Sequence, residues 1–361
     1  MGLKVALACG GTGGHVFPAL AVGKVLREEH GAELVVVGRP GSSEENWARQ
    51  AGFEFRGVKA VPLHRSKIWR NLALPFVASQ AVSQARQVLA SEGVQVVFAT
   101  GGYVCLPAGI AAKRLGVPLV VHEANSHPGV ANRILARMAT RVFAGSPAGA
   151  ARLPRGEVVG NPVRPLDGRT RQDLRQALGL SPEDRFLVVI GGSQGARGVN
   201  RMLAEEAARL VAKGWKILWQ TGAAGLEDAR KVAASLEGVR AEAFVPDVYG
   251  AFGAADLALT RSGGSTLGEL ALHGLPSVLV PFPSATGNHQ EINAREYESA
   301  GAAVVVLESQ WQPGRASDAL DGLWQRREEA ARAMLSFGRP RCAHDLAQAV
   351  VDAAKSPGRS A

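Results

Sequence analysis

Two glycine-rich stretches offer the residue types best suited to chemistry in this chain. Residues 10–14 read GGTGG between an apolar run and His15, and residues 191–195 read GGSQG between a second apolar run and a helical pattern. Glycine lets backbone N–H groups approach a ligand without a Cβ between them, and a helix N-terminus just beyond adds oriented donors and partial positive charge. Phosphate is the usual ligand of this arrangement, so both stretches are predicted to bind phosphate groups.

A third and weaker glycine motif, TGGYVCLP, spans residues 100–107. For any one loop, tight strand-to-helix packing without a ligand stays open, but two equivalent loops favour binding. Neither of the two loops has the GxGxxG spacing of dinucleotide enzymes, and the second strands end at Gly38-Arg39 and Gln220-Thr221 rather than at a carboxylate. Since no GxxxxGK[ST] motif occurs either, an NAD-dependent enzyme is disfavoured and a P-loop nucleotidase is excluded.

The stretch RSGGSTLGEL, residues 261–270, predicts a glycine turn followed by a helix. Two roles are open for Glu269. In a capping box, Thr266 is the N-cap and Glu269 folds back onto it. Alternatively, the Glu269 carboxylate accepts hydrogen bonds from the two hydroxyls of a ribose.

Strand-like apolar runs alternate with amphipathic helical patterns, which predicts parallel sheets with helices on both faces and ligands at the carboxyl ends of the strands. We expect an α/β protein with two doubly wound Rossmann-like domains and a cleft between them: residues 1–160, residues 161–340, and a C-terminal helix in 341–361 that can pack back on the first domain. The Pro-, Gly- and Arg-rich residues 157–170 are the expected hinge. The expected strands are 5–9, 34–37, 94–99, 119–122, 142–144, 186–190, 216–220, 241–244, 257–260, 277–280 and 303–306.

Positive charge is concentrated in the first part of the chain. Residues 1–160 contain 18 Lys and Arg but 9 Glu and no Asp, whereas the remainder contains 23 residues of each sign. An acidic partner is therefore predicted for the first part: phosphate, nucleic acid or an anionic membrane surface.

The three cysteines form no CxxC or CxxH cluster, which disfavours a zinc site or a disulfide scaffold. Neither a signal peptide nor a membrane-spanning run is expected.

Seven motifs in series carry a resemblance to a known family. They are GGTGGHVFPALAV, TGGYV, HEAN, GNPVR, GGSQGARGVN, RSGGSTLGEL and NHQEINA. Together they resemble the bacterial peptidoglycan-precursor N-acetylglucosaminyltransferases. The resemblance implies the GT-B fold and an inverting transfer of N-acetylglucosamine from UDP-N-acetylglucosamine to the C4 hydroxyl of the muramyl sugar of lipid I, the undecaprenyl-diphosphate-linked muramyl pentapeptide, giving lipid II. No cofactor is expected.

The resemblance also implies which residues bind each substrate. Residues that would bind UDP-N-acetylglucosamine are Thr12, Gly13, Gly14, Asn125, Arg164, Ser193, Val245 (through its main chain, to uracil), Gly264, Ser265, Thr266, Leu267, Gly268, Glu269 and Gln290. The acceptor loop would comprise Gly101, Gly102 and Tyr103. Two departures from the family pattern, Ala124 for a glutamine and Cys105-Leu106 for Ser-Gly, concern the acceptor contacts and leave the donor assignment intact.

His15 is the expected general base that takes the proton from the attacking hydroxyl. The positive end of a helix dipole disfavours imidazolium and keeps the ring neutral. The alternative is a histidine that only hydrogen-bonds backbone or phosphate. Because the chain has no DxD motif, no metal is expected, and backbone N–H groups, a helix dipole and Arg164 would stabilise the leaving diphosphate instead.

Residues 63–79 mix cations with large apolar side chains. The predicted membrane patch comprises Arg65, Lys67, Ile68, Trp69, Arg70, Leu72 and Phe76. Each cation attracts anionic headgroups by about 1 kcal/mol, and Trp69 with its apolar neighbours can enter the interface. An amphipathic helix with a solvated basic face is the alternative. With the lipid-linked acceptor that the resemblance implies, we expect a peripheral protein on the cytoplasmic face of the cell membrane.

Two other functions stay open. Another GT-B enzyme that uses UDP-sugars, such as a UDP-N-acetylglucosamine 2-epimerase, would need neither a lipid acceptor nor a membrane patch. A nucleic-acid binder is suggested by the pI of about 9.9. With an aromatic content of 6% and no RRM or KH signature, it is disfavoured, and no nucleic-acid partner is expected.

Overall fold

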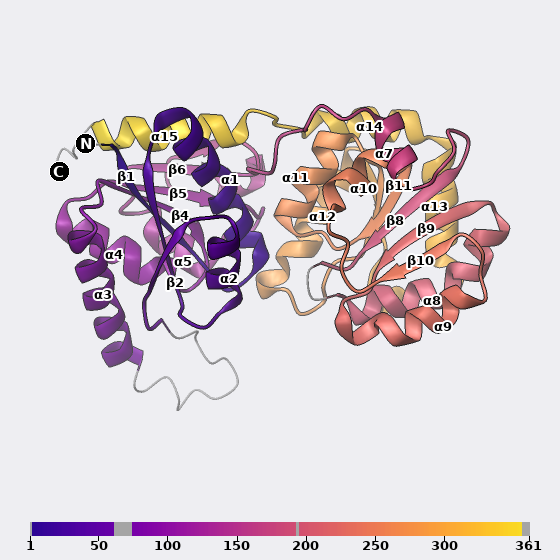
Figure 1. The fold of residues 1–361 in the computed structure, drawn as a ribbon, viewed down its shortest axis with the longest axis horizontal. Helices are drawn as coiled ribbons and strands as arrows, with labels where there is room; N and C mark the ends of the chain where they lie inside the picture. Colours follow the sequence, from indigo (N-terminus) through magenta and orange to yellow (C-terminus); the bar gives the residue numbers. More distant parts are fainter. Residues whose placement is uncertain (1, 61–73, 193–194, 356–361) are drawn as a thin grey trace. The chain divides into compact units, whose positions relative to one another are not determined.

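The computed structural model describes residues 2–60, 74–192 and 195–355, and the chain forms two compact units (Figure 1). Unit 1 comprises residues 1–164 and the final segment from residue 341 onwards. Unit 2 comprises residues 165–340. Each unit has its own parallel sheet and its own buried cores.

Seven parallel strands form the sheet of unit 1, in the order β3-β2-β1-β4-β5-β6-β7. The central strands are apolar runs such as KVALAC in β1 and VVFATG in β4, and nearly all of their residues are buried. Burial on both faces is what an all-parallel sheet covered by helices requires. The strands are β1 Lys4–Cys9, β2 Glu33–Gly38, β3 Glu54–Gly57, β4 Val96–Gly101, β5 Leu119–Glu123, β6 Arg141–Ala144 and β7 Gly156–Val158.

Helices cover both faces of this sheet. One face packs against α1 and α15, and the other packs against α3 and α4. Although α15 follows unit 2 in the sequence, its Leu346 and Val350 are fully buried in the same core as Val16 and Leu26 of α1 (yellow and indigo in Figure 1). The helices are α1 Gly13–His30, α2 Ser43–Gln50, α3 Leu74–Ser91, α4 Cys105–Leu115, α5 Val130–Leu135, α6 Pro147–Ala150 and α15 Cys342–Lys355.

Six parallel strands form the sheet of unit 2, in the order β10-β9-β8-β11-β12-β13. Its two cores lie on opposite faces, and the bulky Trp215 and Trp219 of β9 are both buried. The strands are β8 Arg185–Ile190, β9 Trp215–Gln220, β10 Val239–Glu242, β11 Leu257–Thr260, β12 Ser277–Leu279 and β13 Ala303–Val305. The helices are α7 Arg171–Ala177, α8 Arg197–Ala212, η2 Ala223–Gly225, α9 Leu226–Ala234, α10 Val248–Ala254, α11 Gly264–His273, η3 Thr286–Asn288, α12 His289–Ser299, η4 Glu308–Gln310, α13 Arg315–Gln325 and α14 Arg327–Ser336.

Each sheet reverses its winding once. The reversal falls between β1 and β4 in unit 1 and between β8 and β11 in unit 2. Loops that leave the carboxyl ends of such a strand pair run to opposite faces and open a crevice, where ligands bind in sheets of this kind. The glycine stretches 10–14 and 191–195 begin at the carboxyl ends of β1 and β8, so both lie at a reversal point.

All eleven predicted strands are present, with ends within two residues of the predicted ones. Two further strands, β3 and β7, escaped prediction because they are short edge strands, EFRG and GEV, with exposed charged residues in place of an apolar run. Residues 159–170 contain neither helix nor strand. The predicted α/β class with two doubly wound domains is confirmed.

Candidate active site

His15 lies in the first turn of α1, directly after the glycine loop that follows β1. Its Nδ1 is 3.2 Å from the carbonyl oxygen of Thr100 in β4, and Thr100 Oγ1 donates a hydrogen bond of 2.7 Å to the His15 carbonyl. Because a carbonyl oxygen only accepts, Nδ1 is the donor in this bond, so the neutral form of the ring carries its proton on Nδ1 and its lone pair on Nε2. The two strands at the reversal point thus set both the orientation and the tautomer of one imidazole.

The loop after β4 packs directly on the loop after β1. A Cβ on Gly102 would lie 2.0 Å from the carbonyl oxygen of Gly10, and a Cβ on Gly101 would lie 2.8 Å from His15 Nδ1. Gly101 and Gly102 have φ angles of 109° and 90°, which L side chains rarely adopt. The structure therefore brings the glycines of the predicted acceptor loop into contact with the first glycine loop and with His15.

Cys105 is the first residue of α4, and its thiol forms hydrogen bonds with the loop after β4. The Gly101 N–H donates to Cys105 Sγ at 3.3 Å, and Sγ lies 2.8 Å from the Ala8 carbonyl oxygen and 2.9 Å from that of Gly101. Burial raises the pKa of the Cys105 thiol to about 12, so the group stays protonated and donates. A serine hydroxyl can make the same bonds. This departure from the family pattern therefore leaves the hydrogen bonding of the loop in place.

A buried carboxylate shapes the loop after β5. Glu123 is 1% exposed, and its Oε1 accepts hydrogen bonds from the backbone N and from Nδ2 of Asn125, at 2.9 and 3.1 Å. Its Oε2 accepts from the Gly129 N–H and from Asn132 Nδ2, both at 3.0 Å. Glu123 therefore orients Asn125, which the resemblance placed in the site. Sequence reasoning did not select Glu123 as a site residue, although it belongs to the HEAN motif and ends an apolar run.

The segment that leaves unit 1 is tied to the same loop. Asn161 Nδ2 donates to the Ala124 carbonyl oxygen at 3.1 Å, and His122 Nε2 lies 2.8 Å from the Gly160 carbonyl oxygen. Arg164, the last residue of unit 1 before the chain enters unit 2, is exposed. Because Ala124 acts here through its backbone carbonyl, which any residue supplies, its departure from the family pattern does not remove this contact.

In unit 2, Gln220 links two predicted donor-binding segments. Its Nε2 donates to the Gly192 carbonyl oxygen at 3.1 Å, and its Oε1 accepts from the Val245 N–H at 2.9 Å. Gln220 is 2% exposed, at the carboxyl end of β9. The Val245 N–H, part of the predicted main-chain contact to uracil, is thus bonded to Gln220 within the protein. Sequence reasoning missed this role of Gln220, and Ser193 lies outside the described residues.

The capping-box interpretation of α11 is wrong. The helix begins at Gly264 with Gly263 as its N-cap, and no side chain caps it. Gly263 is extended, with φ −68° and ψ 144°, so the chain turns into the helix too early for Thr266 to be the cap. Glu269 lies within α11 and is partly exposed, whereas Leu267 is 2% exposed and packs in the core. Because three residues separate the end of β11 from the start of α11, the first turn of α11 lies at the carboxyl edge of the unit 2 sheet.

Gln290 in the first turn of α12 joins the loops that follow β11 and β12. Its Oε1 accepts from the Phe282 N–H at 2.9 Å, and its carbonyl accepts from Ser262 Oγ at 2.8 Å. Asn293 Nδ2 adds a hydrogen bond of 3.0 Å to the Ser262 carbonyl. Gln290 and the α11 segment are therefore held at one edge of the unit 2 sheet.

Other sequence predictions fall outside these clusters. The patch residues Arg65, Lys67, Ile68, Trp69, Arg70 and Leu72 lie outside the described residues, and Phe76 belongs to the first turn of α3. None of the described helices has the length and apolar character to cross a bilayer. In the described ranges, no three His, Cys, Asp or Glu side chains gather as a metal site requires.

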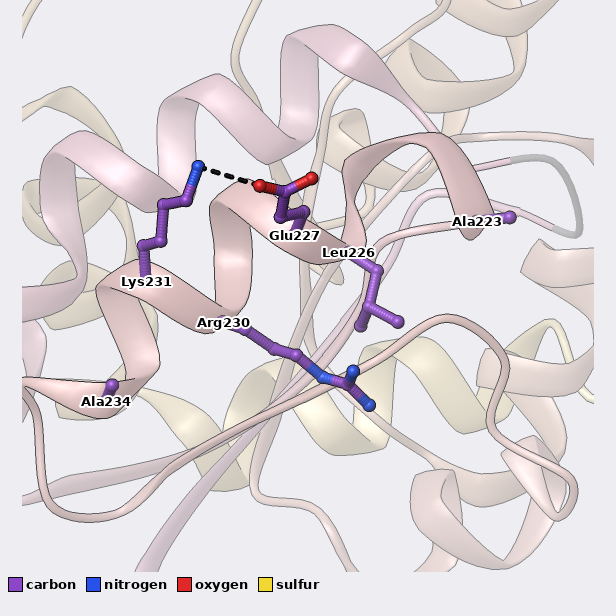
Figure 2. A pocket seen from close by; sticks show the side chains of 6 residues that line it. All are labelled: Ala223, Leu226, Glu227, Arg230, Lys231 and Ala234. Carbon is purple, nitrogen blue, oxygen red and sulfur yellow. Dashed lines mark ion pairs between the residues drawn. The ribbon is translucent and has the colours of Figure 1, made fainter.

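An open hollow lies on α9 of unit 2 (Figure 2). It is lined by Ala223, Leu226, Glu227, Arg230, Lys231 and Ala234. Lys231 Nζ pairs with Glu227 one helical turn away, at 3.1 Å, and both side chains are largely exposed. Pairs of this spacing are ordinary on solvated helix faces, where each contributes roughly 0.2–0.5 kcal/mol. The hollow lacks the convergent polar groups of a ligand site.

Two parallel α/β sheets, each with a glycine-rich loop at its reversal point, form the GT-B fold, which two-domain glycosyltransferases share. The chain belongs to glycosyltransferase family 28, whose N-terminal domain matches residues 5–144 and whose C-terminal domain matches residues 186–348.

Two curated relatives share the name UDP-N-acetylglucosamine--N-acetylmuramyl-(pentapeptide) pyrophosphoryl-undecaprenol N-acetylglucosamine transferase. The relative from Moorella thermoacetica is 37% identical over 98% of this chain and all of its own length. One from Acidithiobacillus ferrooxidans is 41% identical over 83% of both chains. Among solved structures, MurG of Acinetobacter baumannii has a TM-score of 0.78 at 26% identity, covering 97% of this chain and 99% of its own. The calicheamicin glycosyltransferase CalG4, at 18% identity with a TM-score of 0.69 over 98% of this chain and 99% of its own, shares the fold.

Proposed function

We propose that this protein transfers N-acetylglucosamine from UDP-N-acetylglucosamine to the muramyl C4 hydroxyl of lipid I, giving lipid II for peptidoglycan synthesis. The names of its family 28 relatives support both substrates and the transfer. The observation that carries the mechanism is the hydrogen bond from His15 Nδ1 to the Thr100 carbonyl, because it leaves the lone pair on Nε2.

In this proposal His15 is the general base. Nε2 takes the proton from the C4 hydroxyl as the oxygen attacks the anomeric carbon on the face opposite UDP, so the configuration inverts. The first turn of α1 disfavours a positive charge on the ring, which keeps the imidazole in its basic form before the reaction. The glycines of the first loop and of the loop after β4 let the acceptor sugar approach this ring closely.

Unit 2 binds the donor in this proposal. The carboxylate of Glu269 accepts hydrogen bonds from the ribose hydroxyls, and the Val245 carbonyl contacts uracil. The backbone N–H groups at the start of α11 and α8, together with the guanidinium of Arg164, stabilise the diphosphate as it leaves. The donor diphosphate then needs no metal ion held by carboxylates.

We further propose that the protein acts peripherally on the cytoplasmic face of the cell membrane. The acceptor carries an undecaprenyl chain, and the excess of Lys and Arg in residues 1–160 favours contact with anionic headgroups. The apolar and basic side chains of residues 65–76 supply the surface that enters the interface.

A transfer assay tests the function. The protein is incubated with UDP-N-acetylglucosamine labelled in the sugar and with a short-chain lipid I analogue. We expect label in the lipid fraction in equal amount to the UDP released, with a β linkage by NMR. UDP release that needs no acceptor, together with formation of the 2-epimer of the donor, would instead establish the epimerase alternative.

A further inference from the structure

Arg39 lies at the carboxyl end of β2, next to the loops of the site, and the mechanism above does not use it. Its backbone N–H donates to Glu44 Oε1 at 3.3 Å. Glu44 is 3% exposed, and its Oε1 lies 2.9 Å from the position of a Cβ on Gly10. The buried carboxylate therefore anchors the end of β2 against the first glycine loop.

The side chain of Arg39 lies near Tyr103, on the other side of that loop. Its interaction with the Tyr103 side chain raises the pKa of Arg39. The Tyr103 ring lies over Gly11, with Cε1 3.5 Å from the position of a Cβ there. Because Tyr103 belongs to the loop after β4, Arg39 lies near the place where the ends of β1, β2 and β4 meet.

This arrangement differs from that of an arginine that only supports the fold. Arg175 of unit 2 is 5% exposed, and its guanidinium donates to the carbonyls of Ser181 and Ala254. Arg39 is exposed, and the Glu44 carboxylate attracts its guanidinium, but none of the ion pairs among the described residues includes Arg39. A guanidinium has five N–H donors, so this exposed group can bind a phosphate or carboxylate in the bidentate manner.

We propose that Arg39 is a specificity-determining residue for the acceptor and binds an anionic group of lipid I, either the diphosphate or a carboxylate of the peptide. The inference rests on the proposed function. The end of the second strand beside a glycine loop is the place from which doubly wound enzymes contact the ligand on that loop, with an arginine where the ligand carries phosphate. Arg39 lies at this place in unit 1, at the end of β2 beside the first glycine loop, and can therefore contact an anionic group of the acceptor.

Steady-state kinetics of Arg39→Gln and Arg39→Lys test the assignment. We expect Arg39→Gln to raise the KM for the lipid I analogue about tenfold, the loss of one charge-assisted hydrogen bond at an exposed site, with the KM for UDP-N-acetylglucosamine within about twofold of the wild type. Arg39→Lys keeps the positive charge but lacks the two parallel N–H donors of a guanidinium. Its KM for the lipid I analogue should therefore lie between those of the wild type and Arg39→Gln. The control Arg114→Gln removes the same charge from the exposed last turn of α4 and should change neither KM.

Two further acceptors identify the anion. The penalty of Arg39→Gln should disappear either with an analogue whose peptide carboxylates are amidated or with one whose diphosphate is replaced by a neutral linker. The rise in the acceptor KM caused by Arg39→Gln should also become smaller as the salt concentration increases, because the contact is electrostatic. An unchanged acceptor KM in a folded Arg39→Gln protein, or an equal rise for both substrates, overturns the assignment while the proposed function stands. If the wild type transfers no sugar to lipid I, both fail.

Discussion

Replacement of Gly101 by alanine should displace His15 without altering its side chain. The φ of Gly101 is 109°, and an added Cβ would lie 2.8 Å from His15 Nδ1 and 3.2 Å from Asn132 Nδ2. Asn132 is 1% exposed and hydrogen-bonded to the His122 carbonyl, so it cannot yield easily. The imidazole must therefore move by several tenths of an ångström, and its bond to Thr100 lengthens.

The expected magnitudes follow from these contacts. Backbone strain at such a φ costs roughly 1–3 kcal/mol, and each kcal/mol lowers the melting temperature of a unit of this size by about 2–4 °C. A catalytic group misplaced by about 1 Å can lose on the order of 10²-fold in rate. We expect kcat of Gly101→Ala to fall by about 10–100-fold, with a smaller change in the KM for UDP-N-acetylglucosamine because most of its predicted contacts lie in unit 2.

Gly116→Ala is the matched control. Gly116 caps the C-terminus of α4 with a φ of 69°, and no heavy atom lies within 4 Å of its Cβ position. Alanine there should cost roughly 1 kcal/mol of stability and leave kcat intact. Thermal unfolding and transfer kinetics are measured for both variants. If Gly101→Ala keeps a kcat within twofold of that of Gly116→Ala, the Gly101 contact does not position His15 and the reasoning is refuted.

Four other outcomes are expected from the same assay and from simple binding measurements. His15→Ala should lower kcat about 10²–10⁴-fold while donor binding stays intact, as the loss of a general base requires. Gln220→Leu should raise the KM for UDP-N-acetylglucosamine and lower the stability by roughly 1–3 kcal/mol, because the buried Val245 N–H loses its acceptor. A chelator should leave the rate unchanged. Trp69→Ala combined with Arg70→Glu should reduce flotation with anionic liposomes.

Each of these has a contradicting result. A loss below tenfold in His15→Ala removes the residue from the role of base. An unchanged donor KM in Gln220→Leu shows that its bridge does not shape the donor site. Complete loss of activity in chelator, restored only by Mg²⁺ or Mn²⁺, contradicts metal-free stabilisation of the diphosphate. Equal flotation of the wild type and the double variant places the membrane contact elsewhere.

The fold could be predicted because its strands are unbroken apolar runs that a parallel sheet buries on both faces. The edge strands β3 and β7 could not, since one side of an edge strand meets solvent and tolerates charge. The family, and with it the activity, followed from motifs that each span a loop, and both are confirmed.

The residues that orient the site were harder to find from the sequence. Gln220 acts on Gly192 and Val245, which are 28 and 25 residues away, so no local pattern marks it. The capping box failed because the spacing of Thr266 and Glu269 carries no information on where the preceding glycines turn. The roles of His15, Glu269 and the other substrate contacts stay predictions.

The return of α15 to unit 1 has a consequence for biosynthesis. Residues 165–340 are contiguous, so all of unit 2 is synthesised before the last helix of unit 1. Until then, Val16 and Leu26 of α1 lack the side chains of α15 that bury them in the finished protein. Unit 1, which is translated first, is therefore completed last. A chain that stops near residue 340 exposes the apolar surface of α1 that α15 covers in the finished protein.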